Sequence, residues 1–208
     1  MSFAYRVSAY NRQKKWQKFI NIMRPGSKTT ILDAGFSDRE YGPVDNFLEK
    51  NYLYPQKITA LGIDRPREFI KNYPLVKAIC YGGHKFPFTD KSFDIIWSNA
   101  VWEHIIGRES QLNFLREIKR VGCKAFITTP NRFFPVEVHT RLPLLHYLPK
   151  KVFDKILRWL GKPWAAGGYM DPLSLKEVKE LLARAEIKNY QIIKNKLFGL
   201  TLDYIIIF

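Results

Sequence analysis

Short apolar runs alternate with segments of helical periodicity along most of the chain. Helical spacing of apolar residues occurs at 10–23, at 44–52, directly after Arg65-Pro66 and at 108–120. The strand-length apolar runs are TTILDAG (29–35), KITALGID (57–64), LVKAICY (75–81), FDIIWS (93–98) and CKAFITTP (123–130). Strands that are apolar on both faces and alternate with helices predict a parallel sheet covered by helices on both sides.

The C-terminal pattern predicts a different ending. Ser174 and Glu177 form a capping box that opens a helix over 174–186. Two strands follow, YQIIKN (190–195) and LTLDYIIIF (200–208), and their connection is too short for a crossover helix. The sheet is therefore predicted to be mostly parallel, with an antiparallel last strand at the chain end.

Length and composition favour one folded domain over residues 1–208. Hydrophobic residues make up 46% of the chain, and no apolar run reaches the roughly 18 residues of a membrane span. The N-terminal stretch MSFAYRVSAYNRQKKWQ lacks the apolar segment of a secretory signal. Cys80 and Cys123 are too few for a disulfide framework or a zinc site, so we expect no metal and a cytoplasmic location.

The charge balance is strongly basic. Thirty-four Lys and Arg stand against nineteen Asp and Glu, which gives a formal net charge of +15. No acidic residue occurs in residues 1–28, which carry Arg6, Arg12, Lys14, Lys15, Lys18, Arg24 and Lys28. Two interpretations stay open: an anionic partner, such as nucleic acid, a phospholipid surface or a phosphorylated substrate, or a surface charged for solubility.

Polar residues gather where the predicted strands end. Asp33, Asp64, Ser98-Asn99 and Pro130-Asn131 each follow an apolar run. In open parallel sheets, ligands bind outside the carboxyl ends of the strands. The sequence therefore predicts a binding site at this edge.

The residues around these ends resemble those of class I S-adenosylmethionine-dependent methyltransferases. FPFTDKSFDIIWSNAVWEHI (86–105) is similar to the signature LPFxDxSFDxVxSxxVxEH of many small-molecule, "type 11"-like members. ILDAG, LGID and FLREIKRVGCKAFITTPN resemble the first strand, the second strand and the region of the fifth strand. The resemblance covers 29–131 well and 174–208 by element order. It implies a Rossmann-like, seven-stranded α/β fold, S-adenosylmethionine as cofactor and methyl transfer as activity.

The resemblance also implies a set of cofactor-binding residues. They are Asp33, Gly35, Phe36 and Ser37 in the first loop, Asp64 for the ribose hydroxyls, Gly82 and Gly83 near the adenine, and Ser98 and Asn99 beneath the methionine part. Gly35 permits a tight turn, Asp33 can order the loop by accepting backbone N–H bonds, and Asp64 has the alternative role of capping a helix.

Two departures from the family pattern stand out. The usual D-x-G-x-G-x-G loop reads Asp33-Ala34-Gly35-Phe36-Ser37-Asp38, and Tyr81-Gly82-Gly83-His84 offers no carboxylate to the adenine amine. A degenerate cofactor-binding domain without catalysis therefore remains an alternative.

The candidate catalytic residues are bases. An oxygen nucleophile needs a group that takes its proton. Glu137 and His139 are the first candidates, followed by His104 and His146. The alternative for each imidazole is a packed, hydrogen-bonded structural residue.

Residues 132–172 are predicted to form a roof over the substrate pocket, because they follow a strand whose end faces the site. Gly167-Gly168 is a candidate hinge, and KKVFDKILRWLGK (150–162) has the pattern of a basic amphipathic helix. Two interpretations stay open: peripheral contact with an anionic membrane, or a lid packed on its own domain.

The function predicted from all this is O- or C-methylation of a small, apolar or lipid- or glycan-linked acceptor. RNA methylation is the alternative that the charge favours. Against it, the chain lacks an appended RNA-binding domain, and Ser98-Asn99-Ala100-Val101 stands where base-amine enzymes have [ND]-P-P-[YF].

Overall fold

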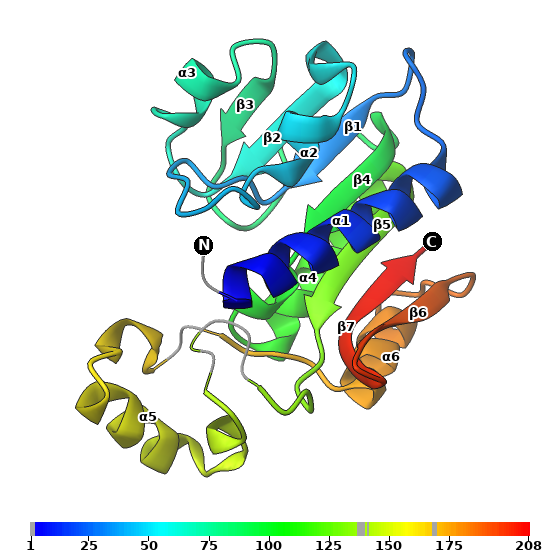
Figure 1. Ribbon diagram of the computed structural model, residues 1–208. Helices are drawn as coiled ribbons and strands as arrows, with labels where there is room; N and C mark the ends of the chain where they lie inside the picture. The colour runs from blue at the N-terminus through cyan, green and yellow to red at the C-terminus, as the bar shows by residue number, and fades with distance from the viewer. Residues whose placement is uncertain (1–2, 137–139, 141, 168–169) are drawn as a thin grey trace.

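The computed structural model describes residues 3–136, 140, 142–167 and 170–208. Within them, seven strands form one sheet in the order β3-β2-β1-β4-β5-β7-β6 (Figure 1). Strands β1 to β5 are parallel, and β7 runs antiparallel to both β5 and β6. The strands are β1 (Ile31–Ala34), β2 (Ile58–Gly62), β3 (Lys77–Cys80), β4 (Phe93–Asn99), β5 (Gly122–Pro130), β6 (Gln191–Leu197) and β7 (Leu200–Ile207). The predicted fold class is confirmed.

The helices follow the predicted order with changed boundaries. The α-helices are α1 (Phe3–Met23), α2 (Phe47–Asn51), α3 (Phe69–Asn72), α4 (Arg108–Val121), α5 (Lys150–Trp159) and α6 (Leu175–Arg184). Short 3₁₀ turns are η1 (Pro55–Lys57), η2 (Trp102–His104), η3 (Leu145–Tyr147) and η4 (Pro163–Ala165). The helix predicted over 44–52 begins only at Phe47, because Asn46 has the left-handed conformation (φ 46°).

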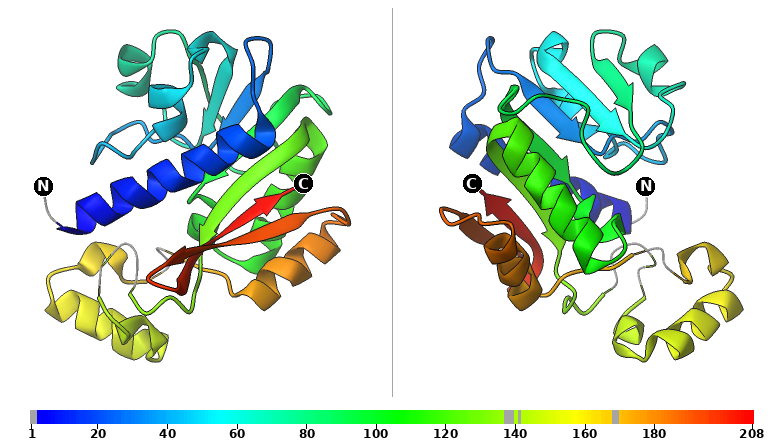
Figure 2. Two further views of the ribbon diagram at one scale, coloured as in Figure 1. Left: turned by 45° about the vertical axis from the view of Figure 1, so that its right-hand side comes forward. Right: turned by 180° about the vertical axis from the view of Figure 1, so that it is seen from behind.

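Each face of the sheet has its own hydrophobic core. Helices α4 and α6 cover the face turned toward the viewer in the right panel of Figure 2, and α1 lies across the other face. Alternating residues of β4 serve the two cores: Ile96 packs toward α4, whereas Trp97 packs toward α1. This explains why the parallel strands are apolar without alternation.

Aromatic side chains attach α1 to the sheet. Phe19 is fully buried and packs edge-on against Trp97 and Phe126, with ring centroids 4.8 and 5.4 Å away. Trp97 and Phe126, on neighbouring strands, stack with an interplanar angle of 4°. These contacts place α1 across β4 and β5.

A buried carboxylate fixes the same helix toward its N-terminal half. Asp203, near the start of β7, accepts hydrogen bonds from Asn11 at 2.7 Å and from Asn195 at 3.0 Å. The ammonium of Lys15 lies 3.5 Å from the same carboxylate, and both side chains are nearly inaccessible. Burial lowers the pKa of Lys15, and the charge of Asp203 opposes that shift. Lys15 therefore neutralises a charge inside the protein.

The C-terminal predictions are confirmed. Ser174 accepts a hydrogen bond from the backbone N–H of Glu177, and Glu177 accepts one from the backbone N–H of Ser174, which completes the capping box. Strands β6 and β7 form the predicted hairpin, closed by the two residues Phe198 and Gly199.

The segment predicted as a roof leaves and re-enters the domain at one point. Asn131 and Leu173 form an isolated parallel bridge at the carboxyl edge of the sheet. Between them, α5 stands away from the sheet and contacts η3 and η4 (Figure 1). Leu157 of α5 is fully buried, whereas Trp159 is exposed. None of the described helices is long and apolar enough to cross a membrane.

Phe19→Ala is expected to lower the free energy of unfolding by about 3–5 kcal/mol, because it leaves a cavity among Trp16, Trp97 and Phe126. Ile22→Ala, at a partly exposed position of the same helix, serves as the control and should cost far less. Urea denaturation followed by circular dichroism measures both. Equal losses for the two variants would contradict the placement of α1.

Candidate functional site

The order of the strands predicts a ligand crevice at one edge of the sheet. Strand order reverses between β1 and β4, because the chain runs outward through β2 and β3 on one side and through β5 on the other. At such a switch point, the loops leaving the two central strands diverge, and ligands bind between them. The predicted site residues at the ends of β1, β2 and β4 therefore meet at one edge.

Gly35 brings the loops after β1 and β4 together. Its φ is +128°, and its N–H donates to the carbonyl of Leu61 at 2.8 Å. A Cβ at this position would lie 2.2 Å from a methyl carbon of Val101. Only glycine fits here, since a side chain would force apart the two loops that form the crevice.

The rest of the first loop is held by side chains where the family has glycines. Ser37 N–H donates to the Asn46 amide oxygen at 2.9 Å, and the Asn46 amide donates back to the Ser37 carbonyl. Asp38 accepts the N–H groups of Glu68 and Phe69 at the start of α3. Asp38 therefore performs the helix-capping role that was the alternative for Asp64.

Phe36 forms the inner wall of this loop. Its ring is buried, lies 4.6 Å from that of Phe69 and fills the space above Gly62, where a Cβ would come within 2.7 Å. The side chain of Phe36 therefore belongs to the core and is not available to a ligand.

The residues after β2 and β3 form an exposed surface that is partly polar and partly apolar. Asp64 is exposed, and within the described residues its carboxylate accepts no hydrogen bond. Ile63 is exposed beside Gly83, whose added Cβ would meet only the Ile63 side chain, at 3.9 Å, and a Cβ at Gly82 would meet nothing within 4 Å. A free carboxylate next to an uncovered apolar surface fits a nucleoside, with its hydroxyls on the carboxylate and its base on the apolar side.

Asp33 lies beneath the loop, away from solvent. Burial raises the pKa of Asp33 to about 6, and a hydrogen bond with Glu49 and the charge of Arg12 oppose the rise. Burial, followed by the charge of Asp33, raises the pKa of Glu49 well above its ordinary value. Neither carboxylate oxygen of Glu49 accepts a hydrogen bond from the described residues, so burial favours the protonated form of this group.

Neither Glu49 nor Arg12 is among the residues that the sequence predicted for the site. Glu49 lies in a charged helical stretch, and Arg12 belongs to the basic N-terminal segment. The pattern of either segment is equally typical of a solvated helix face, so no local signal distinguished them.

Ser98 and Asn99 connect the central strands. The Ser98 hydroxyl is fully buried and donates to the carbonyl of Ala34 at 3.1 Å. The Asn99 amide oxygen accepts from the hydroxyl of Thr128 at 2.6 Å. These bonds join β1 to β4 and β4 to β5 at the edge where the crevice opens.

His104 lies in the short turn η2 that follows β4. It is the last residue of η2 and is partly buried, and its backbone N–H donates to the Val101 carbonyl at 2.9 Å. The preceding Glu103 is fully buried, and its carboxylate accepts from the Thr129 hydroxyl at 3.2 Å. Of the candidate bases, His104 is the one whose side chain the structure describes, since Glu137 and His139 lie outside the described residues, as does the side chain of His146. The catalytic roles stay predictions.

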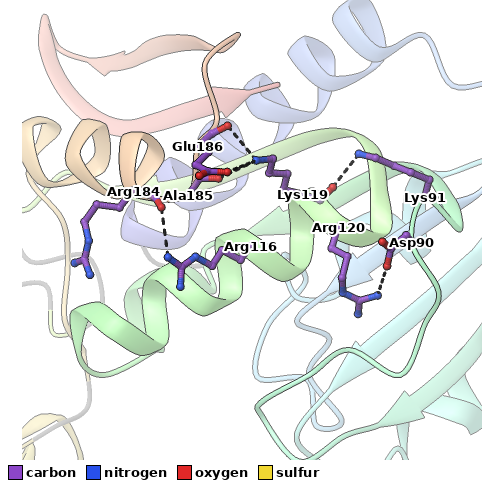
Figure 3. A pocket seen from close by; sticks show the side chains of 8 residues that line it. All are labelled: Asp90, Lys91, Arg116, Lys119, Arg120, Arg184, Ala185 and Glu186. Carbon is purple, nitrogen blue, oxygen red and sulfur yellow. Dashed lines mark hydrogen bonds and ion pairs between the residues drawn. The ribbon is translucent and has the colours of Figure 1, made fainter.

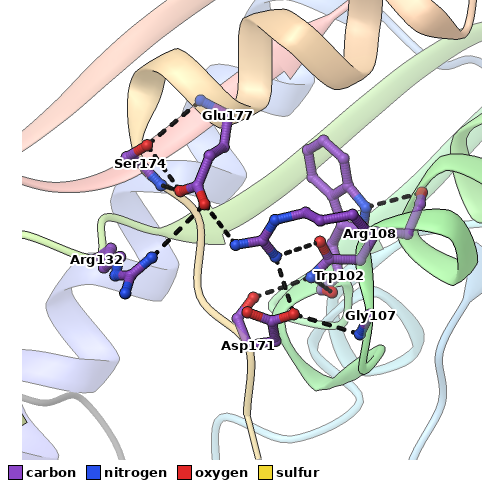
Figure 4. Close-up of polar contacts among 8 residues, drawn as sticks. Trp102, Gly107, Arg108, Arg132, Asp171, Ser174 and Glu177 are labelled. Atoms are coloured by element: carbon purple, nitrogen blue, oxygen red, sulfur yellow. Dashed lines mark hydrogen bonds and ion pairs between the residues drawn. The ribbon is translucent and has the colours of Figure 1, made fainter. Parts of the chain in front are cut away.

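Polar contacts fix the end of the roof segment beside η2. The Asp171 N–H donates to the Glu103 carbonyl at 2.7 Å, and the Asp171 carboxylate pairs with Arg108 at 2.9 Å (Figure 4). Arg108 also reaches Glu177 at 2.6 Å. Burial opposes ionisation of Glu177, but hydrogen bonds from Ser174 and Arg108 outweigh it and lower its pKa to about 2. These contacts fix the C-terminal end of the roof segment at Glu103, the residue that precedes His104.

A groove of about 500 Å³ at the opposite edge of the sheet has a structural explanation (Figure 3). Its cations are engaged: Arg120 pairs with Glu117 at 2.6 Å, and Lys91 and Lys119 donate to backbone carbonyls. These contacts join α4 to the strand turns, and we assign no ligand to this groove.

Comparison with known proteins agrees with the fold. Residues 48–124 match the model of a family described as methyltransferase domain. The fold is similar to that of a SAM-dependent methyltransferase from Aquifex aeolicus, at 17% identity over 94% of this chain and 87% of that chain, with a TM-score of 0.57.

Two further solved structures share the fold. The PH0226 protein from Pyrococcus horikoshii matches at 14% identity over 99% of this chain and 91% of that one, with a TM-score of 0.58. The YcgJ protein from Bacillus subtilis matches at 17% identity over 87% and 70%, with a TM-score of 0.56. Among curated proteins, none matches this chain.

Asp64→Ala is expected to weaken binding of S-adenosylhomocysteine by about 1–3 kcal/mol, because the ribose hydroxyls lose charge-assisted hydrogen bonds. Glu68→Ala, at an exposed carboxylate a few residues further on, should leave binding unchanged. Titration calorimetry compares both variants with the wild type. Equal affinities for the wild type and Asp64→Ala would remove Asp64 from the site.

Glu49→Gln is expected to flatten the pH dependence of stability. The folded pKa values of Asp33 (about 6) and of Glu49 (well above its ordinary value) are raised, so the folded state binds more protons, and stability falls as pH rises from about 4 through these folded pKa values. The variant should match the wild type at pH 5 and melt at a higher temperature at pH 8. Melting temperatures of the wild type, Glu49→Gln and the control Glu68→Gln are compared from pH 4 to pH 8. Three parallel profiles would contradict a raised pKa of Glu49.

Proposed function

We propose that this chain, which belongs to the class I S-adenosylmethionine-dependent methyltransferases, methylates a small, apolar or lipid- or glycan-linked acceptor at oxygen or carbon. The cofactor is S-adenosylmethionine, and the open surface at Asp64, Ile63 and Gly83 fits its adenosine end.

The apolar character of the roof is the observation that supports this acceptor class. The described part of 132–172, which leaves the sheet at its carboxyl edge, exposes several large apolar side chains, namely Phe133, Leu144, Tyr147, Trp159 and Trp164. Exposed apolar side chains on a segment that leaves the sheet at its carboxyl edge are typical of a surface that receives an apolar molecule. A polymeric, highly charged acceptor would gain little from them.

Each part of the site then has a task in the reaction. The cofactor supplies an activated methyl group, so the protein must align the acceptor and exclude water. Asp64 holds the ribose, Gly35 and Val101 keep the central loops closed, and the roof covers the acceptor. An acceptor hydroxyl gives its proton to a base, for which His104, Glu137 and His139 are the candidates.

The apolar surface that α5 can offer to a membrane is smaller than the sequence pattern predicted. Leu157 is buried inside the protein, so the apolar groups left for a bilayer are Val152, Trp159 and Leu160. Lys151 and Lys155 are exposed on the same helix. Each such cation near an anionic membrane contributes about 1 kcal/mol, which supports reversible attachment.

Radiolabel from methyl-labelled S-adenosylmethionine is expected to enter the organic phase when the protein is incubated with a detergent-dissolved lipid extract. RNA offered in parallel should remain unlabelled, because basic residues alone give salt-labile, sequence-independent association. Methyl groups incorporated into RNA at physiological salt would overturn this acceptor class. An Asp64→Ala sample controls for cofactor-dependent transfer.

A further inference from the structure

The turn between β6 and β7 holds a side chain that the fold does not explain. Phe198 and Gly199 are the two central residues of the hairpin, with φ values of 49° and 81°. A two-residue turn with both φ values positive favours Asn-Gly, and an aromatic residue there costs conformational energy. Phe198 is also 83% exposed. It is therefore unfavourable both in conformation and in solvation.

Other apolar groups surround Phe198. Leu200 on the same turn and Tyr10 on α1 are both exposed. Phe198, Leu197, Tyr10 and Val7 line a groove of about 600 Å³ between the hairpin and α1. An apolar surface that gathers side chains from two separate elements is larger than a single stray residue, and such patches mark interaction sites.

The charge around this groove is uniformly positive. The described residues that line it include Arg6, Lys14 and Lys196 and no acidic side chain. Lys14 donates to the carbonyl of Lys196 at 2.9 Å, which holds its ammonium beside the turn without neutralising it. Apolar groups ringed by cations are complementary to a bilayer with anionic headgroups, where the chains receive the apolar groups and the headgroups receive the cations.

The turn lies at the same edge as the substrate crevice. In the register of β5 and β7, Pro130 pairs with Asp203, so residues 198–202 extend past the carboxyl end of β5. Asn131 fixes this base: its N–H donates to the carbonyl of Leu202 at 2.8 Å and its amide to that of Thr201 at 2.9 Å. The turn and the start of the roof therefore lie at the same edge (Figure 1).

We propose that the β6–β7 turn and the N-terminal half of α1 form a docking surface for an anionic phospholipid bilayer, with Phe198 and Leu200 inserted among the acyl chains. This surface is separate from α5. The inference rests on the proposed function in one respect: docking would let an apolar acceptor pass from the bilayer into the crevice. Nucleic acid fits less well: Phe198 and Tyr10 can stack on bases, but Leu197 and Leu200 cannot, whereas a bilayer accepts all four side chains.

Phe198→Asn provides the test, because asparagine is favoured in this turn and the fold should not suffer. Flotation with vesicles of phosphatidylcholine containing about one third phosphatidylglycerol measures binding. We expect the wild type to bind these vesicles, not to bind pure phosphatidylcholine, and Phe198→Asn to lower the partition coefficient about tenfold or more. Lys196→Glu should lower it about fivefold or more. The melting temperature of Phe198→Asn should equal or exceed that of the wild type.

Leu53→Asn is the matched control. Leu53 is 82% exposed but precedes β2 at the opposite edge of the sheet, so its replacement should leave vesicle binding unchanged. The proposal is overturned if the wild type does not bind the anionic vesicles or if Phe198→Asn and Leu53→Asn bind equally. It is also overturned if Phe198→Asn weakens binding to a homopolymeric RNA at physiological salt while vesicle binding stays intact.

The same variants separate this proposal from the proposed function. Methyl transfer to detergent-dissolved lipid extract needs no bilayer, so Phe198→Asn should retain it. Loss of docking with retained transfer supports the surface. Absence of transfer in the wild type, with intact vesicle binding, overturns the acceptor class and leaves the docking surface standing.

Discussion

The buried contact between Asp203 and Lys15 determines how the N-terminal helix lies, and the site depends on that helix. A carboxylate withdrawn from water is stable only when donors surround it, and Asn11, Asn195 and Lys15 supply them from α1 and β6. Replacing one partner would leave an uncompensated charge, so the three elements are constrained to meet. Arg12, one turn from Lys15 along the same helix, then lies close enough to Asp33 to oppose the rise of its pKa.

Because of this arrangement, the basic residues of the N-terminal segment have two different roles. Two of the basic residues in the first 28 act on buried carboxylates: Lys15 lies 3.5 Å from Asp203, and Arg12 interacts electrostatically with Asp203 and Asp33. Arg6 and Lys14 remain at the groove beside the hairpin. One helix therefore neutralises the interior on one side and presents cations on the other.

The loop after β1 shows how a glycine pattern can be replaced. Gly35 is retained because Val101 occupies the space where its side chain would lie. Further along, Asp38 caps α3 and Asn46 holds Ser37, so side-chain hydrogen bonds fix a path that glycines otherwise permit. The loop is ordered by its own contacts, and the adenosine surface at Asp64 and Ile63 stays open beside it.

The order of elements and the hairpin were predictable because each strand and helix carries its own periodic pattern. The capping box at Ser174 was equally local. The boundary at Asn46 was not, since a left-handed residue inside a helical pattern depends on the bond that Asn46 makes to Ser37. Glu49, Arg12 and Asp203 were also not predicted, because their charged partners are distant in the sequence and no local pattern indicates such pairs. Asp64 was expected at this edge because it follows a predicted strand, whereas Gly35 was indicated only by the resemblance to the methyltransferases.

The central claim is that the crevice between β1 and β4 holds the cofactor with its adenosine end over the surface after β2. A crystal structure of the protein with S-adenosylhomocysteine tests this most directly. We expect the ribose hydroxyls within hydrogen-bond distance of the Asp64 carboxylate, the base against Ile63 and Gly83, and the sulfur directed toward His104 and the roof. Density for the ligand at any other place, or none at saturating concentration, would contradict the assignment of the site.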